Sequence, residues 1–144
     1  MFFVPFVVKN TLLMWHRVFG LNDLMPQPGE MQARFGWGEI HVRGDDLGWT
    51  SLEAGALRIE RYLADADDIR DDLDAWAAWI ESRAPEPQQT ALMQQIISTK
   101  QLLTFQAESG EDLARFLAAK TAGLYQIDSR GLFAADGTLL VGED

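Results

Sequence analysis

Alternating hydrophobic and polar residues predict strands in the first half of the chain. Three stretches are enriched in Trp, Ile, Val, Thr and Tyr, and short glycine-containing turns separate them; they span 35–44, 48–54 and 56–63. Such stretches between tight turns predict a three-stranded antiparallel meander. In the third strand, Leu57, Ile59 and Leu63 are expected to face the core, whereas Arg58 and Glu60 face water.

A second β-rich region closes the chain. Residues 124–141 alternate in the same way, and two turns, 128–131 and 136–137, divide them. An Asp-Gly pair between alternating hydrophobic residues is a strong hairpin signal, so this region predicts a second meander. Residues 100–107 predict one more strand, with Leu103 and Phe105 pointing inward.

Hydrophobic residues at helical spacing predict about three helices. The first spans 65–82, begins at Asp65 as N-cap, and carries one hydrophobic stripe made of Ile69, Leu73, Trp76 and Ile80. The second spans 88–98. The third opens with a capping box at Ser109 and ends at Gly123, in the left-handed conformation that favours glycine. Two Pro and one Gly predict a loop over 22–32.

This order of elements predicts an α+β fold. The expected architecture is a mostly antiparallel sheet built from two β-meanders, with about three helices packed on one face. Residues 14–144 are expected to form one domain, because the chain has 144 residues and shows no repeat or low-complexity tract. The hydrophobic run at 1–13 is expected to be either an edge strand or an N-terminal extension, since it is too short for a membrane span and lacks a signal-peptide pattern.

Composition removes several functional classes. The chain has no cysteine, which excludes thiol catalysis and iron–sulfur clusters and fits a cytoplasmic protein. Its net charge of −10 argues against nucleic acid as a partner, because that affinity comes mainly from Lys and Arg. We expect no cofactor, no metal site and no membrane partner.

The negative charge is concentrated in the middle of the chain. Between Asp45 and Glu86 the chain has twelve acidic residues and only four basic ones. A solvated helix face explains most of this run, and a docking surface for a basic partner protein is the functional interpretation. The interaction candidates are Asp67, Asp68, Asp71, Asp72 and Trp79. Trp79 is included because it follows the hydrophobic stripe and is expected at its exposed edge.

Catalytic chemistry has weak candidates. His41 lies on a predicted strand near Glu39 and Asp45, so it is a weak candidate for general base, with a surface histidine as the simpler interpretation. No Ser stands in a nucleophile elbow, and no glycine-rich phosphate loop is present. The sequence therefore favours a protein that is not an enzyme.

Several segments resemble an uncharacterised family of small bacterial proteins. The segments that carry the resemblance are WHRVFG (15–20), ERYLAD (60–65), DAWAAWIE (74–81), LMQQIIST (92–99), LARFLAAKTAGLYQID (113–128) and GLFAADGTLLV (131–141). None is a catalytic signature, so the resemblance implies no activity.

The functional hypothesis is a small acidic protein-interaction module, of the immunity type or regulatory, that binds a basic partner or forms a homodimer. The alternative is a small-molecule-binding protein or an enzyme that uses Asp, Glu or His41 in a Trp-lined pocket.

Overall fold

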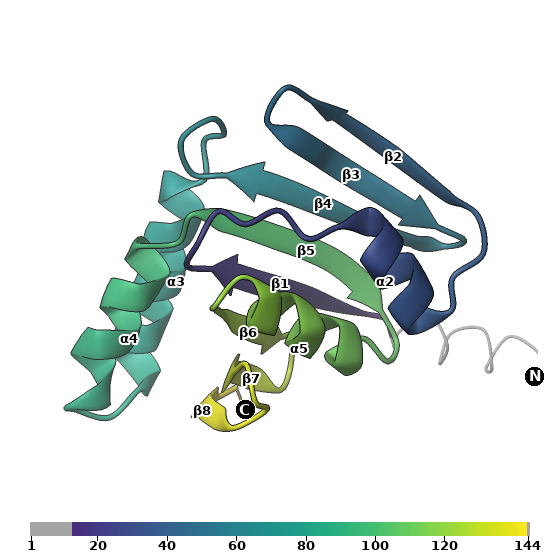
Figure 1. Ribbon diagram of the computed structural model, residues 1–144. Helices are drawn as coiled ribbons and strands as arrows, with labels where there is room; N and C mark the ends of the chain where they lie inside the picture. The colour runs from purple at the N-terminus through teal and green to yellow at the C-terminus, as the bar shows by residue number, and fades with distance from the viewer. Residues whose placement is uncertain (1–12, 144) are drawn as a thin grey trace, which may run out of the picture.

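The structure is a computed structural model that describes residues 13–143. It consists of an eight-stranded antiparallel sheet and, in the described part of the chain, four helices (Figure 1). The predicted α+β class and the mostly antiparallel sheet are confirmed. Residues 1–12 carry most of the predicted edge strand or extension and lie outside the described residues.

Both predicted meanders are present, and two further strands lie between them. The order across the sheet is β2-β3-β4-β5-β1-β6-β7-β8, and every neighbouring pair is antiparallel. The sheet therefore has its first and fifth strands at its centre. The strands are β1 (Met14–Gly20), β2 (Ile40–Asp45), β3 (Gly48–Ala54), β4 (Leu57–Leu63), β5 (Gln101–Ala107), β6 (Leu124–Ile127), β7 (Gly131–Ala134) and β8 (Leu139–Gly142).

The helices lie on both faces of the sheet, which differs from the single covered face expected from the sequence. They are α2 (Pro28–Phe35), α3 (Arg70–Arg83), α4 (Gln88–Ile97) and α5 (Glu111–Lys120). On one face, α2 and α5 bury Met31 and Leu117 against strand residues such as Phe105. On the other, α3 and α4 bury Leu73 and Ile96 against residues such as Phe19. We call these the α2–α5 face and the α3–α4 face.

Successive residues in the central strands explain the two cores. Leu102 and Leu103 are both buried, although they point to opposite faces of β5. Likewise Val18 belongs to the core under α2 and α5, whereas Phe19 belongs to the core under α3 and α4. Continuous hydrophobic pairs of this kind are typical of strands covered on both faces.

Helix α2 corrects the prediction of a loop over 22–32. Pro28 is the first residue of the helix, a position where proline is favourable because its missing N–H needs no partner there. Met31 anchors the helix and is fully buried, and Gly36 ends it in the left-handed conformation with φ 66°.

The predicted helix ends are also corrected. The first helix of the sequence analysis begins at Arg70, after Ile69 rather than Asp65, and the capping box at Ser109 is absent because Gly110 is the N-cap residue of α5. Gly110 lies against the rings of Phe105 and His16, where a Cβ atom would be only 2.6 Å from Phe105 Cε2. At the end of α5, the left-handed residue is Ala122 rather than Gly123. None of the helices in residues 13–143 is long and hydrophobic enough to cross a membrane.

Candidate functional site

A groove lies on the α3–α4 face, where the two helices stop covering the sheet. Strands β4, β5 and β1 form its floor, and the beginning of α3 forms one wall. Its volume is about 560 Å³. We call it the Trp15–Trp76 groove, and its lining residues are Trp15, Arg17, Glu60, Tyr62, Asp67, Asp68, Ile69, Asp72, Trp76, Leu102 and Thr104.

Aromatic side chains give the groove its hydrophobic surface. Trp15 projects from β1 and is 41% exposed, a high value for a tryptophan. Trp76 of α3 is half-buried and packs edge-on against Phe19 and Trp79, with ring centroids 6.0 and 5.4 Å away. Trp76 is thereby fixed in the core under α3 and α4, while Trp15 is available to a ligand.

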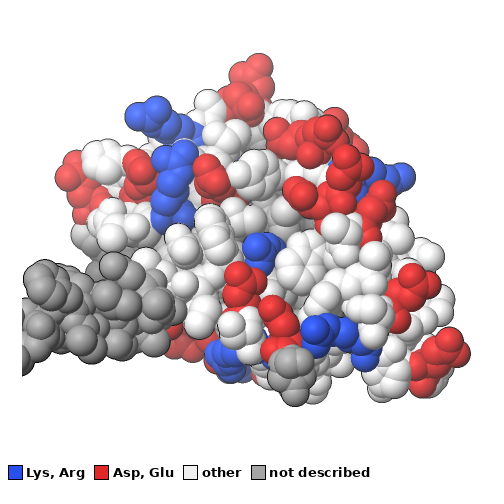
Figure 2. All heavy atoms as spheres, turned by 180° about the vertical axis from the view of Figure 1, so that it is seen from behind, with Lys and Arg blue, Asp and Glu red and all other residues white. Residues whose placement is uncertain are grey.

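Acidic side chains surround these rings. Asp67, Asp68 and Asp72 come from the loop before α3 and from its first turn, and Glu60 comes from β4. Figure 2 looks at the α3–α4 face and shows red side chains gathered at its upper right, beside a mainly white surface. Negative charge therefore lies next to an uncharged, partly aromatic surface, an arrangement that suits a cationic ligand.

The four carboxylates differ in their existing partners. Glu60 accepts a hydrogen bond from Tyr62 Oη at 2.8 Å, and Asp67 accepts one from the backbone N–H of Leu63 at 2.8 Å. Asp68 and Asp72 have no hydrogen-bond or ion-pair partner among the described residues. These two carboxylates are consequently free to pair with a ligand.

Tyr62 reflects the electrostatics of the groove. Burial raises the pKa of Tyr62 to about 12, and the hydrogen bond to the Glu60 carboxylate acts in the same direction. Tyr62 is therefore a neutral hydrogen-bond donor at physiological pH, and it is not a base.

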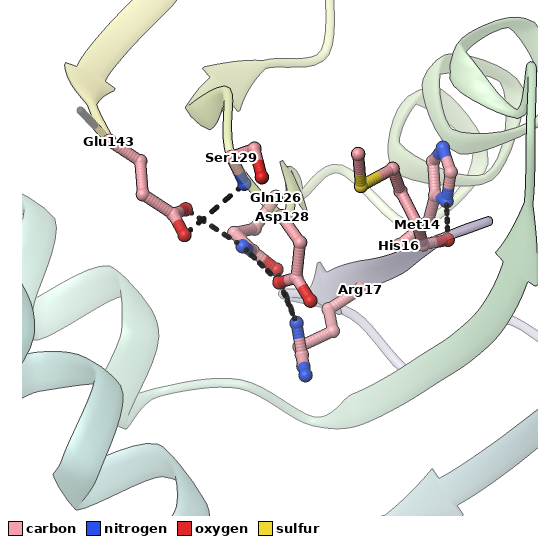
Figure 3. A network of polar contacts seen from close by, with 7 residues as sticks. All are labelled: Met14, His16, Arg17, Gln126, Asp128, Ser129 and Glu143. Carbon is pink, nitrogen blue, oxygen red and sulfur yellow. Dashed lines mark hydrogen bonds and ion pairs between the residues drawn. The ribbon is translucent and has the colours of Figure 1, made fainter. Parts of the chain in front are cut away.

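Among residues 13–143, Arg17 is the only cation that lines the groove, and other residues already neutralise it. Its Nη1 donates to Asp128 Oδ1 at 2.7 Å and to Gln126 Oε1 at 2.8 Å (Figure 3). Gln126 is fully buried and donates in turn to Asp128 and Glu143. The guanidinium lies 5.1 Å from the Trp76 ring centroid, so this network holds a flat cationic group against one side of the groove.

The sequence-predicted interaction residues separate into two groups. Asp67, Asp68 and Asp72 line the groove, whereas Asp71 is exposed on α3 outside it. Trp79 packs against Trp76 within the α3–α4 core and does not line the groove.

The histidines are placed differently from the sequence-based hypothesis. His41 is exposed on the edge strand β2 and lines neither the Trp15–Trp76 groove nor the pocket beside His16. His16 is 2% exposed, stacks on Phe105 at 4.7 Å and lines a small pocket with Glu111 and Arg130. Its Nδ1 donates to the Met14 carbonyl at 2.9 Å, and burial lowers its pKa, so Nε2 is unprotonated at neutral pH.

Sequence reasoning missed Trp15, Arg17 and Tyr62 as groove residues. All three lie on the same face of the sheet, on strands β1 and β4, and these strands come close together because β5 pairs with both of them. Their proximity could be predicted only from the order of the strands between the two meanders, and no local sequence pattern specifies that order.

No cluster of three or more His, Asp or Glu side chains suited to a metal ion occurs in residues 13–143. Searches against family models, curated proteins and solved structures gave no match to this chain. The resemblance of the segments from 15–20 to 131–141 to a bacterial family thus stays an expectation.

Proposed function

We propose that this protein is a binding module that takes a basic segment of a partner protein into the Trp15–Trp76 groove. The observation that carries the proposal is that two unpaired carboxylates, Asp68 and Asp72, line the same groove as the exposed ring of Trp15. An Arg or Lys side chain combines a cationic head with a hydrophobic stem, so it matches both features at once. Neutralisation of a toxin or regulation of a basic protein are concrete forms of this role.

Charge supports this choice of partner. The chain carries −10 overall, and the acidic run before and within α3 lies next to the groove. Such a field accelerates the encounter with a basic partner and repels acidic ones. Arg17 does not oppose it, because Asp128 neutralises its charge from outside the groove.

The test is a tryptophan-fluorescence titration with octa-arginine, using a Gly-Ser octapeptide as the neutral control. We expect saturable binding that weakens steeply between about 50 and 500 mM salt, because exposed charges are screened at high ionic strength. The variant D68N/D72N should lower the affinity by about tenfold or more, since it removes both unpaired carboxylates.

A matched control exists on the same helix. D71N/D74N removes two carboxylates that are exposed on α3 but do not line the groove. We expect this variant to lower the affinity by less than about threefold. Equal losses in the two double variants would show diffuse charge attraction and would contradict binding in the groove.

A small organic cation is the second candidate occupant, because a volume of about 560 Å³ lies within the usual range for small-molecule sites. N-acetylarginine methyl ester distinguishes the two. If it binds as tightly as octa-arginine, the groove recognises a single cationic molecule; much weaker binding supports the protein segment. The homodimer remains a separate prediction, to be checked by light scattering at high protein concentration.

A further inference from the structure

Arg61 is a buried cation in β4, on the face opposite to the groove. It is 4% exposed, and within the described residues no carboxylate lies within 4.0 Å of it. Charged side chains are seldom buried without an ion pair, because removal of the charge from water is unfavourable. Burial lowers the pKa of Arg61, and the more distant Asp45, Asp23 and Asp67 oppose that shift. An arginine still keeps its charge at neutral pH.

Neutral acceptors hold the Arg61 guanidinium in one orientation. Its Nε donates to Gln101 Oε1 at 2.8 Å, and its Nη1 donates to the Trp49 carbonyl at 3.0 Å and the Leu47 carbonyl at 3.4 Å. Gln101 is fully buried and is itself fixed, because its Nε2 donates to the carbonyls of Asn22 and Leu24 at 2.9 and 2.8 Å. Three of the five guanidinium N–H groups are used in this way.

The remaining two N–H groups belong to Nη2 and have no acceptor in residues 13–143. Nη2 is not sealed inside the protein, since Thr99 Oγ1 is the one described buried side-chain polar atom without a partner. Arg61 lines a pocket of about 530 Å³ and a smaller adjoining one of about 120 Å³. A fixed cationic group thus presents two unused donors to an accessible space.

Other donors line the larger pocket. Lys100 is exposed and has no ion-pair partner among the residues that the structure describes. Asn22 also lines it, and its Oδ1 accepts from the backbone N–H of Leu24, so its amide N–H₂ stays available. Two exposed carboxylates, Asp23 and Asp65, complete the polar lining.

We propose that the pocket around Arg61 and Lys100 binds a singly charged carboxylate. The two N–H groups of Arg61 Nη2 donate to the carboxylate oxygens, and the Lys100 ammonium pairs with the same group. A multiply charged anion fits less well, because Asp23 and Asp65 line the pocket and the whole chain carries −10. The carboxylate comes either from a free small molecule or from the C-terminus of a peptide.

The experiment is an amide NMR titration of the full chain at low ionic strength with four probes: acetate, N-acetylglycine, N-acetylglycinamide and inorganic phosphate. We expect acetate and N-acetylglycine to shift the signals of Asn22, Lys100 and their neighbours, and the uncharged amide to shift none. Binding of N-acetylglycine at least about fivefold tighter than acetate indicates a peptide C-terminus, and equal binding indicates a free carboxylate. Tighter binding of phosphate than of either carboxylate contradicts the proposal.

Variants test the residues. Arg61→Gln should lower the affinity for acetate by about tenfold or more, and Lys100→Gln by about threefold, because each removes a charge-assisted hydrogen bond. Arg70→Gln is the matched control, since Arg70 is exposed on α3 and lines neither pocket. If Arg61→Gln does not fold, Lys100→Glu keeps the test decisive, because a reversed charge on an exposed side chain should abolish binding. Unchanged affinity in Lys100→Glu, or an equal loss in Arg70→Gln, overturns the proposal.

Discussion

The two faces of the sheet differ in how far helices cover them. On the α2–α5 face, the helices cover the middle of the sheet, and Val18, Phe105 and Tyr125 are fully buried. On the α3–α4 face, cover ends after Phe19 and Leu102, and the groove begins there. The same strands therefore contribute a hydrophobic core on one side and the floor of a partly polar groove on the other.

Strand β4 shows what this difference produces. Glu60 and Tyr62 point into the groove, whereas Arg61 between them points to the opposite face. Three consecutive residues thus line two different pockets, and we propose a cation for the groove and a carboxylate for the pocket. This is possible because successive side chains of a strand alternate between the faces of its sheet.

The largest expected effect is on the free energy of unfolding, and it compares substitutions on the two faces of β5. Phe105→Ala should lower the free energy of unfolding by about 3–5 kcal/mol, because it leaves a cavity beneath α5. Gln106→Ala, the next residue and exposed on the other face, should change it by less than about 0.5 kcal/mol. Urea denaturation of both variants measures the difference, and comparable losses would mean that the two faces are equally important for stability.

A smaller effect compares two tyrosines that both donate to a glutamate at 2.8 Å. Tyr125 donates to Glu111 from the covered face, and Tyr62 donates to Glu60 in the groove. Tyr125→Phe should lower the free energy of unfolding by about 1.5 kcal/mol, since Tyr125 is fully buried, whereas Tyr62→Phe should lower it by about 0.5 kcal/mol. Thermal or urea denaturation measures both, and a larger loss for Tyr62→Phe would reverse the proposed ranking.

The smallest expected effect is the pH dependence of the free energy of unfolding that His16 causes on the α2–α5 face. Its pKa in the folded protein lies below the ordinary 6.5, chiefly because of burial, so the unfolded chain binds more protons as the pH falls through 6.5. The free energy of unfolding should therefore decrease as the pH falls below about 6.5, by no more than about 1.4 kcal/mol per pH unit for this one group, and be unaffected by His16 well above that pH. Urea denaturation between pH 8 and pH 5 measures this slope.

His16→Phe is the control, because it keeps a ring on Phe105 and removes the titrating group. The pH slope near 6.5 should become smaller in this variant. Glu111 does not confuse the result: its pKa is lowered from 4.5 mainly by the hydrogen bond from Tyr125, so its stabilisation is lost only as the pH falls below that value. An unchanged slope in His16→Phe would exclude His16 as the source.

Local patterns predicted both meanders and three of the helices, because turn residues and hydrophobic spacing act over a few residues. Helix α2 was missed since Pro26, Pro28 and Gly29 indicate a loop, whereas Pro28 in fact starts the helix. The left-handed residue after α5 is Ala122, and the glycine at 123 has a different role: it passes too close to the backbone of Phe19 to carry a side chain. Such tertiary contacts between distant segments have no signature in a local window.

The site was predicted only in part. The charge pattern singled out Asp67, Asp68 and Asp72, which line the groove, but it did not single out Glu60. Trp15 and Tyr62 required the strand order. A signal for Arg61 was present, because it is in phase with Ile59 and Leu63, which were expected to face the core. The alternation thus predicted that Arg61 points inward. This prediction was not made, because a buried cation is rare.

The central position of β1 has a consequence for synthesis. This strand is synthesised well before its partners β5 and β6, which lie at residues 101–107 and 124–127. Each meander can form from nearby residues, but the middle of the sheet closes only after about a hundred further residues have been translated. Until then Val18 and Phe19 lack the neighbours that bury them. The nascent chain therefore exposes a hydrophobic segment of the kind that chaperones bind.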